Sequence, residues 1–162
     1  MVKYFQSYIK TPIGLLAVEA TDQFVISVDF VKRRKNVSAN KISKKAAEQL
    51  KEYFSGKRKK FSVPVFFTGT VWQNKVWTKL LSVPYGATLS YKDLAILAGK
   101  PQAARAVGRA VNKNPIAIIV PCHRVIGSGG DLVGYAGGLK KKEFLLLLEQ
   151  KKAQILTHFK IL

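Results

Sequence analysis

The sequence contains one cysteine, Cys122, and two histidines. A single cysteine excludes a disulfide within the chain, and it equally excludes a zinc site built from several thiolates. Two histidines leave few ligands for other kinds of zinc site, so we expect a protein without zinc. A lone cysteine is most often a small, inert, buried hydrophobic residue. Its neighbours in the chain therefore decide whether Cys122 has a chemical role.

Long hydrophobic runs are also missing. No apolar run approaches the ~20 residues that a helix needs to cross a bilayer, and the first five residues lack the layout of a secretory signal peptide. Hydrophobic residues nevertheless make up 48% of the chain, which is enough for a packed core and argues against global disorder. We expect a folded cytoplasmic protein that does not associate with membranes.

Acidic residues are scarce. There are 9 of them against 28 lysines and arginines, a formal net charge of +19. An excess of this size attracts polyanions, and nucleic acid is the leading candidate partner. A lysine-rich, heat-adapted surface is the alternative, and a basic membrane binder is less favoured because the charge is spread along the chain. The basic runs at 32–35 and 57–60 either contact DNA or are solvated loops.

The first 67 residues have the predicted strands and helix of a small α/β domain. A turn signal at 11–14 separates the first two of three β-rich stretches, at 2–9, 15–20 and 24–30. Apolar residues recur every four positions from Ile42 to Phe54, which predicts an amphipathic helix. Residues 61–67 form either a final strand or an extended linker. We place a domain boundary near Thr68, giving an α/β domain over 1–67 and a mainly helical domain over 68–162.

The second half is expected to be helical. Periodicity and end signals predict helices at 71–81, 91–98, 102–112 and 139–152, with a short apolar strand at 116–120. Ser90 and Asp93 have the spacing of a capping box, and Pro101 is expected in the first turn of the helix that follows it. A three-residue turn that contains Gly99 joins the second and third helices, as in a helix-turn-helix. The pattern leaves open whether 153–162 packs on the body.

The third of these helices is unusual because most of its surface is small. Its small residues are Ala103, Ala104, Ala106, Gly108 and Ala110, and its long side chains are Arg105 and Arg109. Small residues let a helix approach something narrow, and they equally allow tight packing against another helix. Taken alone, these residues favour tight packing against another helix.

The predicted strand at 116–120 leads directly to Cys122, followed by His123 and Arg124. A thiol reacts as its thiolate, so a nucleophilic cysteine needs a base or positive surroundings. Neighbours on an extended strand face opposite ways, so a tight turn or a bridging water is needed to connect His123 to the sulfur. Glu149 is the best available acid to orient His123. Cysteine proteases share such a pair and acid, but they need neither the paired helices nor the charge.

Several motifs occur together and in order. They are Gly86, Ser90-Tyr91, Ala103-Ala104-Arg105-Ala106-Val107-Gly108, Asn114-Pro115, Pro121-Cys122-His123-Arg124-Val125, Tyr135-Ala136-Gly137-Gly138-Leu139 and Lys142-Glu143. In this combination the second half resembles the O6-alkylguanine-DNA alkyltransferases, and the Thr11–Gly14 turn resembles the same family more loosely. The resemblance implies an α/β fold with a small ribonuclease-H-like N-terminal domain. It also implies a mainly helical, winged-helix-like C-terminal domain with a helix-turn-helix.

The resemblance implies a DNA-repair enzyme that moves an alkyl group from O6 of guanine, or O4 of thymine, to Cys122 in a single turnover. His123 would take the thiol proton through a water, and Glu149 would orient His123. Tyr91 would assist flipping and donate a proton to guanine N3, although it is otherwise an ordinary core aromatic. Asn114 would tie the recognition helix to the site, although it is otherwise a C-terminal helix cap.

The resemblance also implies how DNA and the damaged base are bound. Arg105 would fill the gap left by the flipped nucleotide, with an ordinary phosphate contact as the alternative. The implied DNA-binding set is Ser90, Tyr91, Ala103, Ala104, Arg105 and Gly108. The implied substrate pocket contains Val111, Val125, Tyr135, Ala136 and Gly137. Some relatives have Ser at the position of Ala136. The implied O6 contact comes from the backbone, so alkyl transfer should survive this difference. The difference bears instead on tolerance for bulky adducts.

The implied partner is double-stranded DNA that contains O6-alkylguanine, bound by a monomer without metal or organic cofactor. The rival function is that of a non-catalytic DNA binder, either a damage sensor or a transcriptional regulator. Both functions use the helix-turn-helix and the charge, but only the enzyme requires the thiol.

Overall fold

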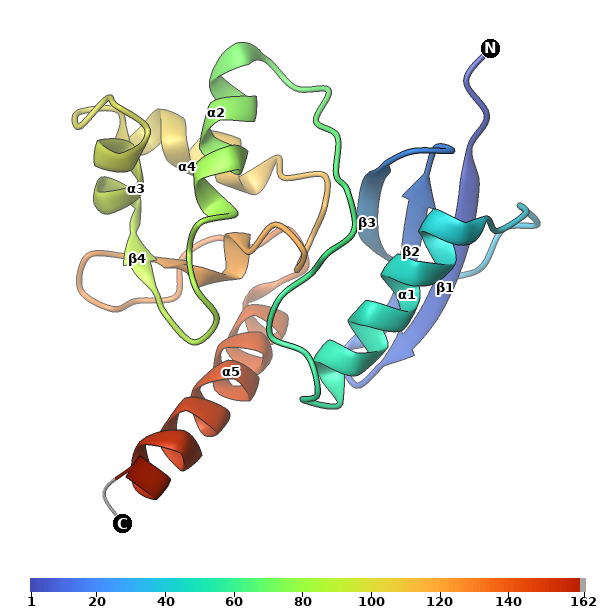
Figure 1. Ribbon diagram of the computed structural model, residues 1–162. Helices are drawn as coiled ribbons and strands as arrows, with labels where there is room; N and C mark the ends of the chain where they lie inside the picture. The colour runs from blue at the N-terminus through green and yellow to red at the C-terminus, as the bar shows by residue number, and fades with distance from the viewer. Residues whose placement is uncertain (161–162) are drawn as a thin grey trace. The chain divides into compact units, whose positions relative to one another are not determined.

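The structure is a computed structural model that describes residues 1–160, and for residues 151–160 it describes the backbone alone. The chain separates into two compact units (Figure 1). Unit 1 consists of Met1–Thr68 together with Pro115–Ile119, and unit 2 consists of Gly69–Asn114 and the residues from Val120 onward. Each unit is described by itself below.

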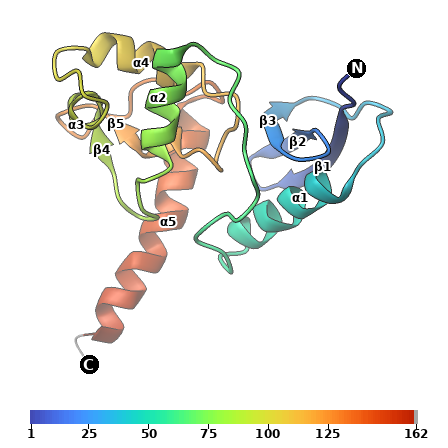
Figure 2. The ribbon, with the colours of Figure 1, turned by 45° about the horizontal axis from the view of Figure 1, so that its top comes forward.

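Unit 1 is a three-stranded antiparallel sheet covered by one helix. Its strands are β1 (Phe5–Thr11), β2 (Gly14–Ala20) and β3 (Val25–Val31), in the spatial order β1-β2-β3. The helix α1 (Lys41–Phe54) lies across one face of the sheet (Figure 2). A capping box between Asn40 and Ser43 starts this helix. The four-residue apolar spacing then buries one side of α1 against the sheet, as predicted.

The structure decides two predictions about extended segments, those at 61–67 and 116–120. Residues 61–67 hold only an isolated bridge between Val65 and Val25, so this segment is an extended linker rather than a strand. The predicted strand at 116–120 is wrong. Ile116 makes one isolated bridge to Val28 of β3, and Ile118 has a φ of 70°. This left-handed backbone conformation is unfavourable for a β-branched residue and interrupts any strand. Pro115–Ile119 thereby belong to unit 1.

Unit 2 is mainly helical, with two short parallel strands. Its elements are α2 (Val71–Leu80), β4 (Leu89–Ser90), α3 (Tyr91–Leu97), α4 (Ala104–Asn112), the 3-10 turn η1 (Cys122–Arg124), β5 (Val125–Ile126) and α5 (Leu139–Lys160). The capping box of Ser90 and Asp93 is confirmed: Ser90 Oγ accepts from Asp93 N at 3.0 Å. The end of α5 differs from the prediction, because its backbone continues past Lys152 to Lys160. The packing of side chains in this terminal segment lies outside the described residues.

The helix-turn-helix is formed by α3 and α4, with a longer connection than predicted. The helix α4 begins at Ala104 rather than at residue 102, so Pro101 lies in the connecting turn and not in the first helical turn. No side chain caps α4 at Ala103. Gly99 ends the first helix with a φ of 82°, the left-handed conformation that glycine adopts readily.

The small residues of α4 divide into those that pack inside unit 2 and those that stay partly exposed. Trp77 Nε1 donates to the Ala110 carbonyl at 2.8 Å, and Trp72 Nε1 donates to the Ala106 carbonyl at 3.4 Å. This part of α4 therefore serves close packing against α2. Ala103, Ala104 and Gly108 are only half-buried, and Arg105 and Arg109 are exposed.

Gly69 is required where the chain enters unit 2. A Cβ at this position would lie 2.5 Å from Cζ3 of Trp77, a buried ring held by its hydrogen bond to Ala110. We expect Gly69→Ala to lower the free energy of unfolding by about 1–3 kcal/mol, as overpacking does. Urea denaturation measures this change. The control is Gly129→Ala, whose nearest contact would be an ordinary 3.5 Å, and we expect a change within ~0.5 kcal/mol. Equal losses would contradict the packing argument.

Candidate active site

Cys122 opens the tight turn η1 rather than continuing a strand. The Cys122 amide donates to the Val120 carbonyl at 2.8 Å, and the Arg124 amide donates to the Pro121 carbonyl at 3.0 Å. Cys122 is 7% exposed, and His123 and Arg124 are also buried. The alternation expected of a strand therefore does not apply, and three consecutive reactive or charged side chains lie inside unit 2.

A buried carboxylate joins the other two side chains of this turn. Glu149, on α5, lies 2.7 Å through Oε1 from Nε2 of His123. Arg124 donates to the same carboxylate twice, from Nε to Oε2 and from Nη2 to Oε1, each at 2.9 Å. The backbone amide of Gly86 donates to Oε2 at 3.2 Å, and Arg124 Nη1 donates to the Val83 carbonyl at 2.6 Å. The predicted pairing of His123 with Glu149 is present in this geometry.

Electrostatics fix the charge state of this network. Burial alone would raise the pKa of Glu149, but hydrogen bonds and charge from His123 and Arg124 outweigh it and lower the pKa to about 2. Burial is the main cause that lowers the pKa of His123, and Arg124 contributes in the same direction. At neutral pH the site therefore holds an ionised carboxylate beside a neutral imidazole.

The tautomer of His123 follows from that charge state. An ionised carboxylate only accepts hydrogen bonds, so Nε2 of His123 carries the hydrogen and donates to Glu149. Nδ1 is then left with a free lone pair. It is buried, and no group in the described part of the chain hydrogen-bonds to it. A buried atom of this kind ordinarily has a water or ligand partner, and Nδ1 is able to accept a proton.

The thiol is held in its neutral form. Burial raises the pKa of Cys122, and this outweighs the opposing effects of the Asn114 amide, the Lys142 charge and the nearby backbone amides. Asn114 also donates to the Val120 carbonyl at 2.9 Å, so it ties the residues after α4 to the turn that carries the sulfur. The predicted nucleophile thus needs a base during reaction, because it is not stored as a thiolate.

Sequence reasoning missed the roles of Lys142 and Arg124. The fully buried Lys142 donates to the carbonyls of Val133 at 3.1 Å and Gly134 at 3.0 Å. It thereby anchors the glycine-rich segment before α5. The available signal was spacing: Lys142 precedes Glu149 by seven residues and so lies on the same face of a helix. Arg124 was taken as general positive charge near the thiol, whereas its main partner is Glu149.

The remaining predicted site residues fall into two groups. Tyr91 is half-buried and interacts electrostatically with Cys122, and its hydroxyl donates to the Val133 carbonyl at 2.6 Å. Val111 and Val125 are buried, Tyr135 and Gly137 are half-buried, and Ala136 is exposed. Ser90, Ala103, Ala104, Arg105 and Gly108 belong to the helix-turn-helix. These helix-turn-helix residues carry no acid or base for the thiol. Those on or next to α4 present its small surface and Arg105.

Neither a metal-binding cluster nor a membrane-spanning helix is present among the described residues. No cluster of three or more histidine, cysteine, aspartate or glutamate residues there is arranged to hold a metal ion. None of the described helices combines the length and apolarity needed to span a membrane.

The sequence matches two family models. Residues 71–151 match the DNA-binding domain of 6-O-methylguanine DNA methyltransferase, and residues 4–67 match the ribonuclease-like domain of the same family. A methylated-DNA–protein-cysteine methyltransferase of Methanosarcina barkeri is 46% identical over 153 residues, which cover 90% of this chain and 97% of that protein.

Solved structures give the same result. The O6-methylguanine methyltransferase of Mycobacterium tuberculosis superposes with a TM-score of 0.83 at 39% identity, covering 92% of this chain and 94% of that one. A structure of the Mycobacterium tuberculosis protein in complex with DNA has a TM-score of 0.82 at 42% identity, over 91% of this chain and 92% of that one.

Glu149→Gln tests the buried network. The change leaves the buried Arg124 without its counter-charge, so we expect the free energy of unfolding at pH 7 to fall by about 3–5 kcal/mol. The pKa of Glu149 is lowered on folding, so its contribution is present above about pH 4.5 and is lost as the pH falls toward about 2. Denaturant unfolding should therefore show the gap between wild type and variant narrowing over this range.

The matched control is Glu52→Gln. It breaks the partly exposed Arg58–Glu52 pair of 3.1 Å in unit 1, and such pairs contribute less than ~1 kcal/mol. A Glu149→Gln loss no larger than the Glu52→Gln loss would show that the buried carboxylate does not stabilise the turn at Cys122.

Proposed function

Because the chain belongs to the 6-O-methylguanine DNA methyltransferase family, we propose that it repairs DNA by transferring an alkyl group from O6 of guanine to Cys122. The observation that carries the proposal is the arrangement at η1. A neutral thiol and a neutral histidine occupy one buried turn, and the histidine has an unoccupied proton-accepting nitrogen. These are the groups that a thiol needs to become a nucleophile only when a substrate is present.

In the proposed step, the Cys122 sulfur attacks the alkyl carbon as the bond between that carbon and O6 breaks. The thiol proton passes to Nδ1 of His123 through a bridging water, and the Glu149 carboxylate stabilises the charged imidazolium that forms. A proton delivered to guanine N3 makes neutral guanine the leaving group. The thioether product is stable, so the protein acts once.

Tyr91 is the proposed donor of the N3 proton. Burial is the main cause that raises its pKa, so the hydroxyl is protonated at neutral pH. That hydroxyl donates to the Val133 carbonyl in the present structure. Donation to guanine therefore requires it to change acceptor, and Lys142 still holds the Val133 carbonyl at 3.1 Å when it does.

Burial of the sulfur argues for an extrahelical substrate. A thiol only 7% exposed cannot approach O6 inside a stacked duplex, so the damaged nucleotide has to leave the helix. Arg105 is exposed on α4 and long enough to fill the resulting gap, and its guanidinium offers donors to the unpaired partner base. The half-buried Ala103, Ala104 and Gly108 suit close approach of α4 to the minor groove.

The proposed pocket uses backbone groups more than side chains. The carbonyls of Cys122 and Val125 would accept from the guanine exocyclic amine, and the amide of Ala136 would donate to O6. Tyr135 would pack beside the alkyl group, with Val111 and Gly137 completing the lining. Asn114, which contacts both the Val120 carbonyl and the sulfur, would couple α4 to this pocket.

The proposed partner is double-stranded DNA with an O6-alkylguanine, bound by a monomer in the cytoplasm without a cofactor. The structure of the Mycobacterium tuberculosis protein in complex with DNA supports binding to DNA. The competing function, a DNA binder without catalysis, needs no proton-accepting nitrogen in the turn that carries Cys122.

A labelled substrate tests the transfer itself. Duplex DNA carrying label on the O6-methyl carbon should pass the label to the protein with a ceiling of one equivalent, because the thioether is not regenerated. Cys122→Ala should abolish transfer and leave binding to the same duplex within about twofold. Transfer by Cys122→Ala at the wild-type rate would refute the proposal.

Arg105→Ala tests the flipping role. We expect the transfer rate from duplex substrate to fall at least tenfold, while transfer from free O6-benzylguanine stays within twofold, because the free base needs no flipping. Arg109→Ala is the matched control, since Arg109 is exposed on the same helix one turn later. Equal losses by Arg105→Ala on both substrates would argue against an intercalating role.

A further inference from the structure

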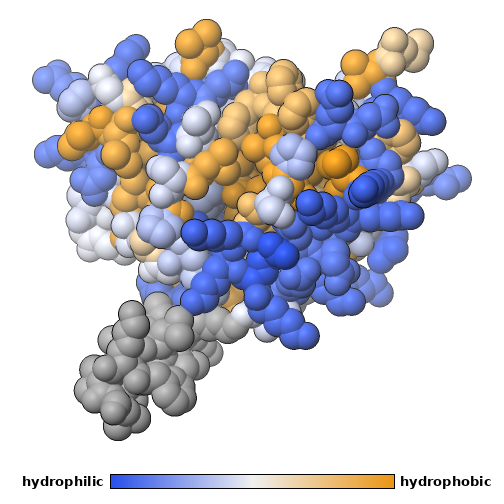
Figure 3. All heavy atoms as spheres, viewed as in Figure 1, coloured by the Kyte–Doolittle hydropathy of each residue, from blue (hydrophilic) through white to orange (hydrophobic). Residues whose placement is uncertain are grey.

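Half of the 28 lysine and arginine residues lie in residues 1–68, which contain neither the thiol nor the helix-turn-helix. The proposed repair reaction uses none of them. Figure 3 shows hydrophilic residues gathered over the α1 side of unit 1. These lysines and arginines need an explanation of their own.

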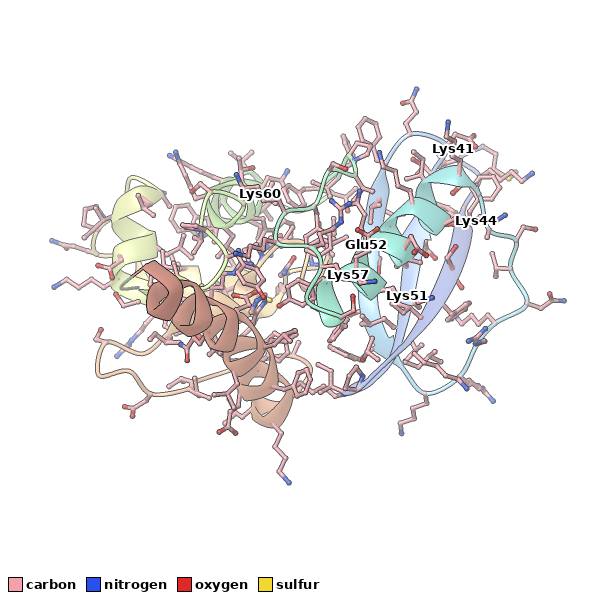
Figure 4. All side chains as sticks on the ribbon, turned by 60° about the horizontal axis from the view of Figure 1, so that its bottom comes forward. Lys41, Lys44, Lys51, Glu52, Lys57 and Lys60 are labelled. Atoms are coloured by element: carbon pink, nitrogen blue, oxygen red, sulfur yellow. The ribbon has the colours of Figure 1, made fainter. Side chains whose placement is uncertain are left out.

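The charge is ordered along one helix. Lys41, Lys44, Lys45 and Lys51 are all exposed on α1, on the side opposite the residues that pack on the sheet. Lys57 and Lys60 follow in the loop after the helix and are exposed as well. We call these six lysines the α1 basic face. Figure 4 shows Lys41, Lys44 and Lys51 spread along the helix, with Lys57 beyond its end.

One exposed acid, Glu48, lies on α1 within this face, and a single carboxylate does not neutralise six lysines. Within the described residues no salt bridge joins any of its lysines to a carboxylate, and Glu52 is instead paired with Arg58 at 3.1 Å. Arg58 Nη1 also donates to the Lys60 carbonyl at 2.9 Å, which fixes the loop that carries Lys57 and Lys60. The ion pair therefore shapes the segment while leaving the lysines charged.

Helix stability does not explain the lysines either. The first turn of α1 contains no acidic residue, although acids are favoured at the positive end of the helix dipole. Lys41 and Lys44 stand there instead, and Lys51 alone is placed where the dipole favours a cation. The helix dipole therefore does not account for Lys41 and Lys44, and only Lys51 lies where the dipole favours a lysine.

A hollow adjoins this face. It lies between β1 and α1, has a volume of about 510 Å³, and Lys44, Lys51 and Tyr8 are among its lining residues. The guanidinium of Arg34 lies 5.7 Å from the centre of the Tyr8 ring, which brings a further cation toward this edge. Lysines thus border this recess, and its lining also includes the acidic Glu48.

We propose that the α1 basic face binds the phosphate backbone of duplex DNA without regard to lesion or sequence. The choice of DNA as partner rests on the proposed function. Lys44 and Lys51 are two helical turns apart, about 10.5 Å along the axis, and each strand of B-DNA offers a phosphate about every 3.4 Å along the duplex. The face therefore meets several phosphates, and their released counterions drive binding.

The experiment compares two triple variants of the full-length protein. The test variant carries Lys41→Gln, Lys44→Gln and Lys51→Gln. The control carries Lys3→Gln, Lys10→Gln and Lys32→Gln, which remove the same charge from exposed sites of unit 1 outside α1 and its following loop. Binding to an unmodified 20-base-pair duplex is measured by fluorescence anisotropy from 50 to 300 mM salt.

The test variant should bind at least tenfold more weakly at about 100 mM salt. Its slope of log K against log salt should be smaller in magnitude by about 2–3, since each lost phosphate contact removes ~0.9. The control should lose less than threefold, because it alters only the general field. Equal losses by both variants would overturn the proposal, as would a test variant that lost affinity for phosphatidylserine vesicles while binding DNA normally.

Two further measurements separate this proposal from others. Circular dichroism and thermal unfolding verify that both variants are folded. Transfer from free O6-benzylguanine should match wild type in both variants, because none of the changed lysines belongs to the groups proposed for the transfer step. If wild type transfers no alkyl group, the proposed function fails, yet the comparison on unmodified duplex still decides the role of α1.

Discussion

The site depends on one ionised carboxylate, that of Glu149, held inside unit 2. Removing a carboxylate from water is costly unless its charge is balanced and its lone pairs are used. Both conditions are met here, by two bonds from Arg124 and by further bonds from His123 and the Gly86 amide. Because this carboxylate only accepts, it dictates which nitrogen of His123 carries the hydrogen. The proton-accepting nitrogen near the thiol is thus a consequence of Arg124, which never approaches the substrate in the proposed reaction.

Burial, rather than this network, keeps the thiol of Cys122 neutral. A low-pKa thiolate would be exposed to oxidation and to adventitious alkylation, and either would end the working life of a protein that acts once. Burial holds Cys122 protonated, while the neutral His123 supplies the route for the proton when a substrate closes the pocket. Reactivity is therefore conditional on occupancy. Lys142 fixes the segment around Val133, and its charge lowers the pKa of Cys122 in opposition to burial.

Much of this arrangement could be predicted from sequence where the rule is local or the motif is specific. The capping box at Ser90 depends on neighbouring residues alone, and the sequence predicted that Glu149 pairs with His123, the residue after Cys122. Predictions were wrong where distant contacts decide the outcome. Composition predicted a strand at 116–120, but the segment forms a single bridge, from Ile116 to Val28 of β3, and then turns at Ile118. The role of Arg124 was missed because its partner lies on α5, and only the fold brings the two together.

The division of charge between the units follows from what the lesion site requires. In the proposed complex α4 enters a narrow groove and needs small side chains, so it has room for few cations, and the exposed Arg105 and Arg109 are its only long side chains. Affinity for DNA in general comes from phosphate neutralisation, which needs many lysines or arginines. The two requirements compete for the same surface if one element has to meet both. Placing a row of lysines on α1 removes the conflict, because general affinity and lesion recognition are then set by different residues. A protein that acts once also gains from this, since non-specific binding lets each copy slide and hop along DNA to the lesion.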